Sequence, residues 1–295
     1  MHRIARIAIA ALASVGMLAS VAACGSGQST SEKNGTIEVA ASVNQWGTVA
    51  KALGGDNVNV TSIINSTNVD AHDYEPTTSD IAKLQKAQVI IVNGAGYDAW
   101  AVKAAQTANA IIVNAAEIGG VNDGENPHVW FSADVRKAVA QAITEAYEQA
   151  DAAKKNDFDK MNDQWAAEEN NVESKIAEVK QKTDGLAYAA TESVASYLAE
   201  DMGLADATPS GYARATANES EPTPTDIKQF TDALKAGEIK LLVVNTQEES
   251  ELTGKITDAA KSVEVPMVEL TEQMPEQYDS LTDWMAALVD AFSQA

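Results

Sequence analysis

Four side chains that can bind metal ions follow predicted strands of this sequence: His72, His128, Glu192 and Glu272. The two histidines come after the runs VNVTSII and AIIVNAAEI, and the two glutamates come after GLAYAAT and VPMVELT. Open α/β sheets bind ligands beyond the carboxyl ends of their strands, so we expect all four side chains to face one cleft. Two neutral imidazoles and two carboxylates balance the charge of a divalent cation, which offsets much of the free-energy cost of burying the ion.

The segments that must position these side chains alternate between short apolar runs and helical stretches. In the first half, the runs TIEVAAS, VNVTSII, VIIVN and AIIVNAAEI are separated by stretches such as DIAKLQKA and YDAWAVKAAQTA. The second half repeats the theme with GLAYAAT, IKLLVVNT and VPMVELT, and its EPTPTDI (221–227) matches EPTTSDI (75–81) at five of seven positions. Near-continuous apolar strands between helices predict mainly parallel sheets covered on both faces. We therefore expect an α/β protein with two lobes of similar design.

A long helix is predicted between the two lobes. The stretch 151–182 contains neither Gly nor Pro, and its large apolar residues recur at helical spacing, at Phe158, Met161, Trp165, Val172, Ile176 and Val179. At about 1.5 Å per residue such a helix is roughly 48 Å long, enough to run along both lobes. The expected domains are an N-terminal lobe over 36–150, a connecting helix over 151–183 and a C-terminal lobe over 184–295.

The N-terminus has the features of an exported lipoprotein. Arg3 and Arg6 precede the apolar run IAIAALASVGMLASVAAC, which is typical of a signal peptide over residues 1–23. VAAC resembles a lipobox and predicts lipidation of Cys24, followed by a flexible Gly/Ser-rich tether over 24–35. No second apolar run reaches membrane-spanning length. The protein is expected outside the cytoplasm, attached to the cell membrane by its lipid without crossing it.

Composition excludes several other classes of protein. Acidic residues number 43 against 21 basic ones, a net charge of −22, so nucleic-acid phosphates are repelled. Cys24 is the only cysteine, so neither a disulfide framework nor a thiolate metal site is available.

The segment NGAGYDA has the spacing of a dinucleotide-binding turn, with Gly94, Gly96 and Ala99 at the motif positions and Glu117 near the expected acid. This turn follows the third strand of its lobe, which argues against nucleotide binding.

The sequence resembles the solute-binding lipoproteins of bacterial ABC transporters for zinc and manganese over essentially the whole mature chain. HDYEPTTSDIAKLQKAQVIIVNGAGYDAW is similar to the segment with that family's first ligand, NPHVWF to the second and TESVASYLAEDMGL to the third. The resemblance implies two α/β lobes joined by one long helix, with His72, His128 and Glu192 as ligands. It also implies a monomeric receptor, not an enzyme, that delivers its metal to a separate permease and ATPase.

The fourth ligand and the identity of the metal are less constrained. The family usually has Asp where this chain has Glu272, and Asp279 and Asp283 are substitutes further along. The histidine-rich loop of many zinc-binding members is replaced by GGVNDGENPH, which contains no histidine besides His128. Zinc, manganese and iron stay open: the Irving–Williams order favours zinc over manganese, whereas the mixed ligands and the short loop favour manganese.

A second interpretation uses the same residues in a different class of protein. In a secreted zinc-dependent hydrolase, three of the four ligands would hold zinc, and Asp73 or Glu75 would activate water at an open coordination position. A hydrolase needs a substrate pocket beside the metal, whereas a carrier needs a closed set of ligands. Adjacent genes for a metal permease and an ATPase would favour the carrier.

Overall fold

A computed structural model describes residues 35–69 and 71–295 of the chain. Within this part, eight strands form two separate four-stranded sheets, and all strand pairs are parallel. None of the helices described is both long enough and apolar enough to cross a membrane. The predicted signal peptide, Cys24 and nearly all of the tether lie outside the described residues.

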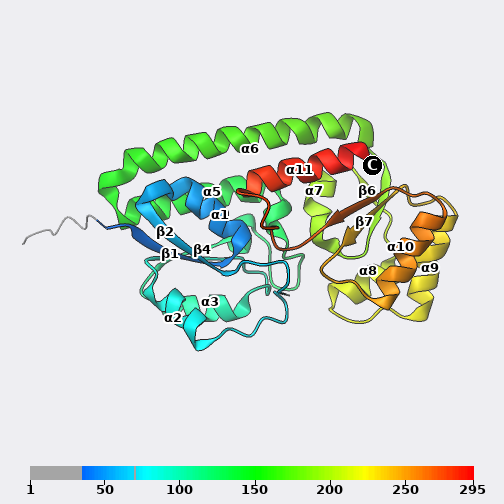
Figure 1. The fold of residues 1–295 in the computed structure, drawn as a ribbon, viewed down its shortest axis with the longest axis horizontal. Coiled ribbons are helices and arrows are strands. Elements are labelled where there is room, and N and C mark those ends of the chain that lie inside the picture. Colours follow the sequence, from blue (N-terminus) through cyan, green and yellow to red (C-terminus); the bar gives the residue numbers. More distant parts are fainter. Residues whose placement is uncertain (1–34, 70) are drawn as a thin grey trace, which may run out of the picture. The chain divides into compact units, whose positions relative to one another are not determined.

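The first sheet has the order β2-β1-β3-β4 (Figure 1). Its strands are β1 (Ile37–Val43), β2 (Val58–Ile64), β3 (Val89–Val92) and β4 (Ile111–Asn114). Alternate residues of the central strands face opposite layers, with Val39 and Val89 in one core cluster and Ala40 and Ile90 in another. The connecting segments are α1 (Asn44–Gly54), η1 (Gly55–Asn57), α2 (Thr78–Lys86), α3 (Ala99–Ala105), α4 (Ala115–Gly119), η2 (Val129–Phe131) and α5 (Ala133–Ala150).

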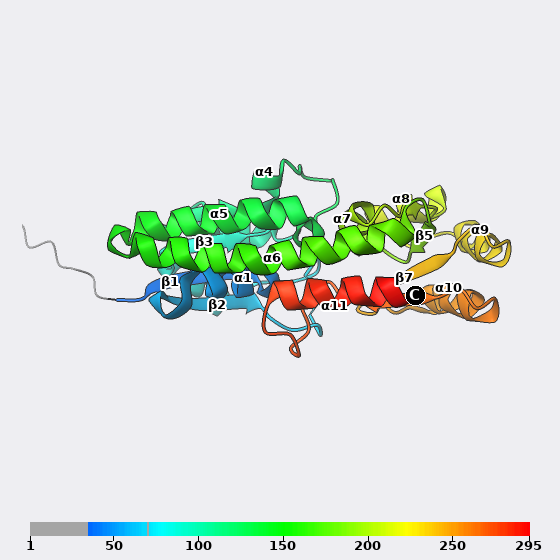
Figure 2. The same cartoon turned by 90° about the horizontal axis from the view of Figure 1, so that it is seen from above.

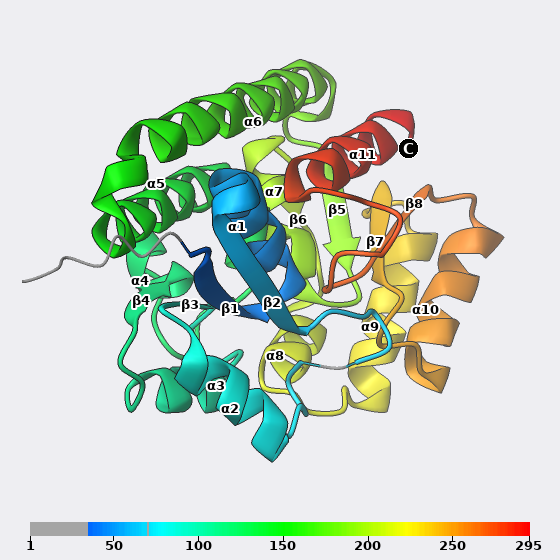
Figure 3. The ribbon, with the colours of Figure 1, turned by 60° about the vertical axis from the view of Figure 1, so that its left-hand side comes forward.

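The second sheet repeats this topology in the order β6-β5-β7-β8. Its strands are β5 (Ala187–Ala190), β6 (Ala205–Asp206), β7 (Leu241–Asn245) and β8 (Met267–Leu270). The helices α8, α9 and α10 cover one face of this sheet through a core that includes Phe230 and Leu242 (Figure 3). The connecting segments are η4 (Ser193–Ala195), α7 (Ser196–Asp201), α8 (Ser210–Ala217), α9 (Pro224–Lys235), α10 (Glu251–Ser262) and α11 (Leu281–Gln294).

The repeated sequence fragment has the same structural role in both sheets. In EPTTSDI, Thr77 caps the start of α2 through a reciprocal hydrogen-bonded box with Asp80, and in EPTPTDI, Thr223 caps α9 with Asp226 in the same way. Each helix leads into a central strand, β3 or β7. The predicted α/β class with two similarly built sheets is therefore confirmed.

The long helix α6 (Lys155–Thr183) packs against α5, α11 and α1 (Figure 2). It begins a few residues later than predicted, because Asp151, with φ of −146° and ψ of 84°, is not helical and a short 3-10 turn, η3 (Ala152–Lys154), comes first. Its buried stripe consists of Phe158, Trp165, Glu169, Val172, Ile176, Val179 and Thr183. The apolar members of this stripe belong to one hydrophobic cluster that also contains residues of both sheets. The helix therefore supports both sheets from one side.

One predicted strand is partly wrong. The run AIIVNAAEI forms β4 only as far as Asn114, and the residues after it form α4. The Asn114 side chain accepts a hydrogen bond from Glu117 N, which caps α4 and ends the strand. His128 consequently lies beyond a helix and a loop, and not directly after a strand.

Candidate metal centre

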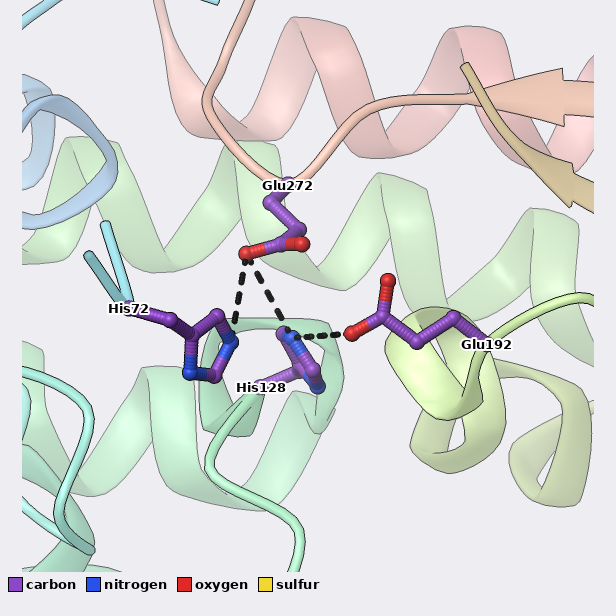
Figure 4. Close-up of side chains that lie close together, drawn as sticks. All are labelled: His72, His128, Glu192 and Glu272. Atoms are coloured by element: carbon purple, nitrogen blue, oxygen red, sulfur yellow. Dashed lines mark ion pairs between the residues drawn. The ribbon is translucent and has the colours of Figure 1, made fainter. Parts of the chain in front are cut away.

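His72, His128, Glu192 and Glu272 come together at the carboxyl ends of the strands. One nitrogen or oxygen atom from each of the four side chains lies within 4.8 Å of the others (Figure 4). Three side chains are nearly enclosed, with exposed fractions of 2% for His128, 3% for Glu272 and 12% for Glu192, while that of His72 is 17%. The first sheet supplies both imidazoles and the second supplies both carboxylates, as the strand-end argument predicts.

The spacing of these atoms suits a single metal ion. Nε2 of His128 is 3.7 Å from Glu192 Oε1 and 3.7 Å from Glu272 Oε2, and Nε2 of His72 is 3.7 Å from the same Glu272 oxygen. With zinc–ligand bonds of about 2.0–2.2 Å, ligand atoms in a tetrahedral site are about 3.3–3.6 Å apart. A small contraction would bring these atoms to metal-binding distance.

The other nitrogen of each imidazole faces an oxygen acceptor. Nδ1 of His128 is 2.7 Å from Asn126 Oδ1, and Nδ1 of His72 is 3.1 Å from Glu219 Oε1. An acceptor at Nδ1 keeps the proton there and leaves the lone pair on Nε2, the form in which histidine binds metals. The buried Nε2 of His128 makes no hydrogen bond to any residue that the structure describes. A bound cation would satisfy a buried acceptor of this kind.

Two further residues hold the carboxylates, and sequence reasoning missed their roles. The Asn245 amide donates to Glu192 Oε2 at 2.6 Å and to Glu272 Oε1 at 3.1 Å, and the buried Tyr97 hydroxyl donates to Glu272 Oε2 at 2.8 Å. The signal for Asn245 was the Val-Asn pair that ends two apolar runs in corresponding places, at Asn93 and Asn245. Tyr97 gave no signal beyond its place in the NGAGYDA turn.

The backbone of Glu272 is fixed from both sheets. Oε1 of Gln247 accepts from Glu272 N at 2.6 Å and from Gln273 N at 2.9 Å, and the Gln45 amide donates to Glu272 O at 2.6 Å. This set of hydrogen bonds determines where the carboxylate emerges. The alternative acids Asp279 and Asp283 are exposed and do not belong to the group of four.

Burial and neighbouring charges separate the pKa values of the two carboxyl groups. Burial raises the pKa of Glu192 to about 9, and the negative charges of Glu272 and Glu248 add to the shift. Burial by itself would also raise the pKa of Glu272. The neighbouring His128, His72 and Tyr97 side chains outweigh burial and lower this pKa to about 2. Burial also lowers the pKa of His128. In the metal-free site, Glu192 therefore holds a proton more readily than Glu272 does.

The site borders a pocket of about 630 Å³ that is rich in acidic groups. His72 and Glu192 are among its lining residues, and its other acidic residues are Asp73, Glu219, Glu221, Glu248, Glu249 and Glu251. Lys255 is the one Lys or Arg side chain in the described lining. A negative field of this kind attracts cations toward His72 and Glu192.

The dinucleotide interpretation of NGAGYDA is not supported by the geometry of the turn. The buried Asp98 carboxylate accepts hydrogen bonds from Asn93 N at 2.6 Å and Gly94 N at 2.8 Å. A pyrophosphate would need such backbone N–H groups. Gly94 has a φ of +82°, and a Cβ there would lie 2.2 Å from Asn114 Oδ1, so glycine is required for the close approach of two strand ends.

Comparisons with known proteins identify the family of the chain. Residues 39–295 match the family described as "Zinc-uptake complex component A periplasmic". The manganese ABC transporter substrate-binding lipoprotein PsaA of Streptococcus pneumoniae is 24% identical over an alignment of 253 residues that covers 79% of each chain. The iron ABC transporter substrate-binding lipoprotein MtsA of Streptococcus pyogenes serotype M1 is 26% identical over an alignment of 236 residues that covers 72% of this chain and 73% of the relative.

Solved structures show the same fold. The periplasmic zinc-binding protein TroA from Treponema pallidum superposes with a TM-score of 0.74 at 15% identity, covering 88% of this chain and 99% of TroA. A crystal structure of ZnuA gives a TM-score of 0.72 at 18% identity, with 88% and 99% of the two chains covered. Since the family match spans nearly all of the described residues, this chain belongs to the periplasmic zinc-uptake component A family of metal-binding proteins.

Proposed function

We propose that this protein is a lipid-anchored receptor outside the cytoplasm that binds one divalent transition-metal ion and delivers it to an ABC permease. The observation that carries the proposal is the convergence of two imidazoles and two carboxylates within 4.8 Å, in a family of metal-uptake proteins. His72, His128, Glu192 and Glu272 are its four ligands. Their two negative charges match the charge of the ion, which offsets its desolvation.

Enclosure of the site supports a carrier. Glu272 is buried, and hydrogen bonds from Tyr97 and Asn245 occupy its carboxylate while Gln45 holds its backbone. A metal held by four protein ligands in such a shell has no open position for a reacting water. The alternative of a secreted zinc-dependent hydrolase finds no support in the relatives, which are named as substrate-binding lipoproteins of transporters.

The physiological partners follow from the class of protein. Substrate-binding lipoproteins of ABC transporters act with a permease and an ATPase, and we propose the same partners for a monomer of this chain. Lipidation of Cys24 after removal of residues 1–23 would attach it to the membrane. The relatives are named for manganese and for iron and a structural neighbour for zinc, so the cargo is proposed as Zn²⁺ or Mn²⁺, with Fe²⁺ as the third candidate.

Metal analysis tests the proposal directly. The full-length chain, purified in detergent without chelator, is expected to contain close to one equivalent of a first-row divalent metal. After the metal is removed, calorimetric titration should return one tight site. Failure of every candidate metal to bind would refute the receptor function.

A further inference from the structure

Asn245 connects the two carboxylates of the metal centre. It ends β7 and is 2% exposed, and its side-chain nitrogen donates one hydrogen bond to Glu192 Oε2 and another to Glu272 Oε1. The distances are 2.6 Å and 3.1 Å. An amide nitrogen has two hydrogens, so this one group satisfies one oxygen of each carboxylate.

The oxygens that Asn245 holds are not the ones that face the histidines. Glu192 Oε1 and Glu272 Oε2 lie 3.7 Å from Nε2 of His128, whereas Asn245 binds Oε2 of Glu192 and Oε1 of Glu272. Each carboxylate therefore presents one oxygen to the histidines (Figure 4). The other oxygen of each accepts a hydrogen bond from the Asn245 amide. Glu272 Oε2 also accepts from the Tyr97 hydroxyl, which leaves its second lone pair for the ion.

The Asn245 amide is itself held in orientation. Its Oδ1 accepts a hydrogen bond from Gln247 N at 3.0 Å, so the NH₂ group points away from that turn toward the carboxylates. The backbone nitrogen of Asn245 donates to Thr191 Oγ1 at 3.0 Å, which anchors the residue next to β5. Rotation of the amide would break the bond to Gln247 and leave two carboxylate oxygens without a donor.

We infer that Asn245 limits Glu192 and Glu272 to one metal bond each and so makes the centre selective for zinc over manganese. The inference rests on the proposed function. Two imidazole nitrogens and two single carboxylate oxygens provide four donor atoms, the number that zinc prefers in tetrahedral sites. If both carboxylates bound through two oxygens, six donors would surround the ion, which suits manganese better. This selectivity is opposite to the manganese preference that the mixed ligands and short loop suggest.

The test compares the zinc-to-manganese affinity ratio of the full-length chain with that of two variants. Asn245→Leu removes the amide with little change in size, and Asn245→Asp keeps an oxygen for Gln247 N while removing the donor. In both variants, the zinc-to-manganese affinity ratio should fall by about tenfold or more. Mutation of a residue that hydrogen-bonds to a metal ligand typically changes metal affinity by 10–100-fold. X-ray absorption of the zinc-loaded parent should give four ligand atoms, and that of the variants more than four.

Asn126→Leu is the matched control, because Asn126 contacts His128 and neither carboxylate. It should weaken zinc and manganese binding alike and leave their ratio unchanged. The apo melting temperature of each variant checks folding, and the Asp variant keeps the test valid if the Leu variant does not fold. A parent that prefers manganese, or two folded variants with the parent's ratio, would overturn the inference. A parent that binds neither metal would instead refute the proposed function.

Discussion

Glu219 Oε1 lies 3.1 Å from Nδ1 of His72 and thereby joins the loop after α8 to the loop after β2. The corresponding contact of His128 is made inside its own loop, by Asn126 two residues earlier. The two imidazoles are thus oriented differently, one by a near neighbour and the other by an acid from the second half of the chain. Glu219 is 73% exposed and has a φ of +51°, a conformation that is unfavourable for a residue other than glycine. The contact between Glu219 and His72 is the more easily lost of the two.

Glu219→Ala should weaken metal binding by about tenfold, the lower end of the range for partners of metal-binding histidines, because the acid is largely exposed. The loss should come mainly from faster metal release, since the contact helps to hold His72 in place after binding. Stopped-flow release into excess chelator measures this rate.

Glu221→Ala is the control for charge alone. Glu221 lines the same acidic pocket but belongs to no ion pair with His72 among the described contacts. Its removal should slow metal association slightly and leave release unchanged, because exposed charges act mainly on encounter rates. Equal release rates in the parent and Glu219→Ala would show that Glu219 does not position His72.

His72→Ala and His128→Ala should each lower metal affinity by orders of magnitude, since each removes one of the four proposed ligands. The two variants should differ in apo stability. His128 is buried among Tyr97 and Trp130, so its truncation leaves a cavity, whereas His72 is partly exposed in a loop. Calorimetric titration and apo melting curves report the two effects separately. Affinity near that of the parent in either variant would remove that histidine from the site.

The arrangement of the strands, and of the side chains that follow them, could be predicted because it depends on local patterns. Apolar runs between helical stretches indicate parallel strands, and the topology of such sheets brings their carboxyl ends together. His72, Glu192 and Glu272 could be placed in this way from chain position alone. The stripe from Phe158 to Val179 likewise predicted α6 to within a few residues of its start.

The residues around the ligands could not be predicted in this way, because their partners are remote in sequence. Tyr97 and Glu272 are 175 positions apart, and Asn245 and Glu192 are 53 apart. No periodicity or motif relates such pairs, and each forms only when both sheets are in place. The end of β4 was missed for a different reason: AIIVNAAEI is apolar except for Asn114 and Glu117, and the cap that these two residues form is what separates strand from helix.

Metal affinity should fall steadily as the pH is lowered from about 9. The pKa of Glu192 is raised to about 9 in the metal-free protein, so at neutral pH the ion must displace a proton from it. Calorimetry at pH 7 in buffers of different ionisation enthalpy should show proton release on zinc binding, and Glu192→Gln should abolish most of it. Affinity that is constant between about pH 7.5 and 5 would contradict both this prediction and histidine ligation.

The raised pKa of Glu192 predicts that the stability of the metal-free protein depends on pH in the opposite direction to metal affinity. The folded pKa of Glu192 is above its unfolded value, so between about pH 4.5 and 9 the folded state binds more protons than the unfolded state. The contribution of Glu192 to stability is therefore present at low pH and lost as the pH rises toward 9. The apo melting temperature of the parent should fall over this range relative to that of Glu192→Gln. Parallel curves for the two proteins would mean that Glu192 is ionised in the apo site.

Substitutions at Glu272, the proposed fourth ligand, separate the effect of its charge on metal affinity from the effect of its side-chain length. Glu272→Gln keeps the size and one acceptor oxygen but deletes a negative charge, so metal affinity should fall substantially while apo stability changes little. Glu272→Asp restores the charge on a side chain one methylene shorter. Gln247 and Gln45 fix the backbone at this position, so the main chain cannot move inward to compensate.

Glu272→Asp should therefore recover only part of the affinity lost in Glu272→Gln. It should also lose the hydrogen bond from Tyr97, because the Tyr97 hydroxyl lies 2.8 Å from Oε2 of the longer Glu272 side chain and the Asp carboxylate does not reach as far. Asp279→Asn and Asp283→Asn are the controls, because both side chains are exposed and outside the group of four, and each removes the same unit of charge. Calorimetric titration of all four variants decides the assignment. If Glu272→Gln binds metal like the parent while either control does not, the fourth ligand is one of the two aspartates.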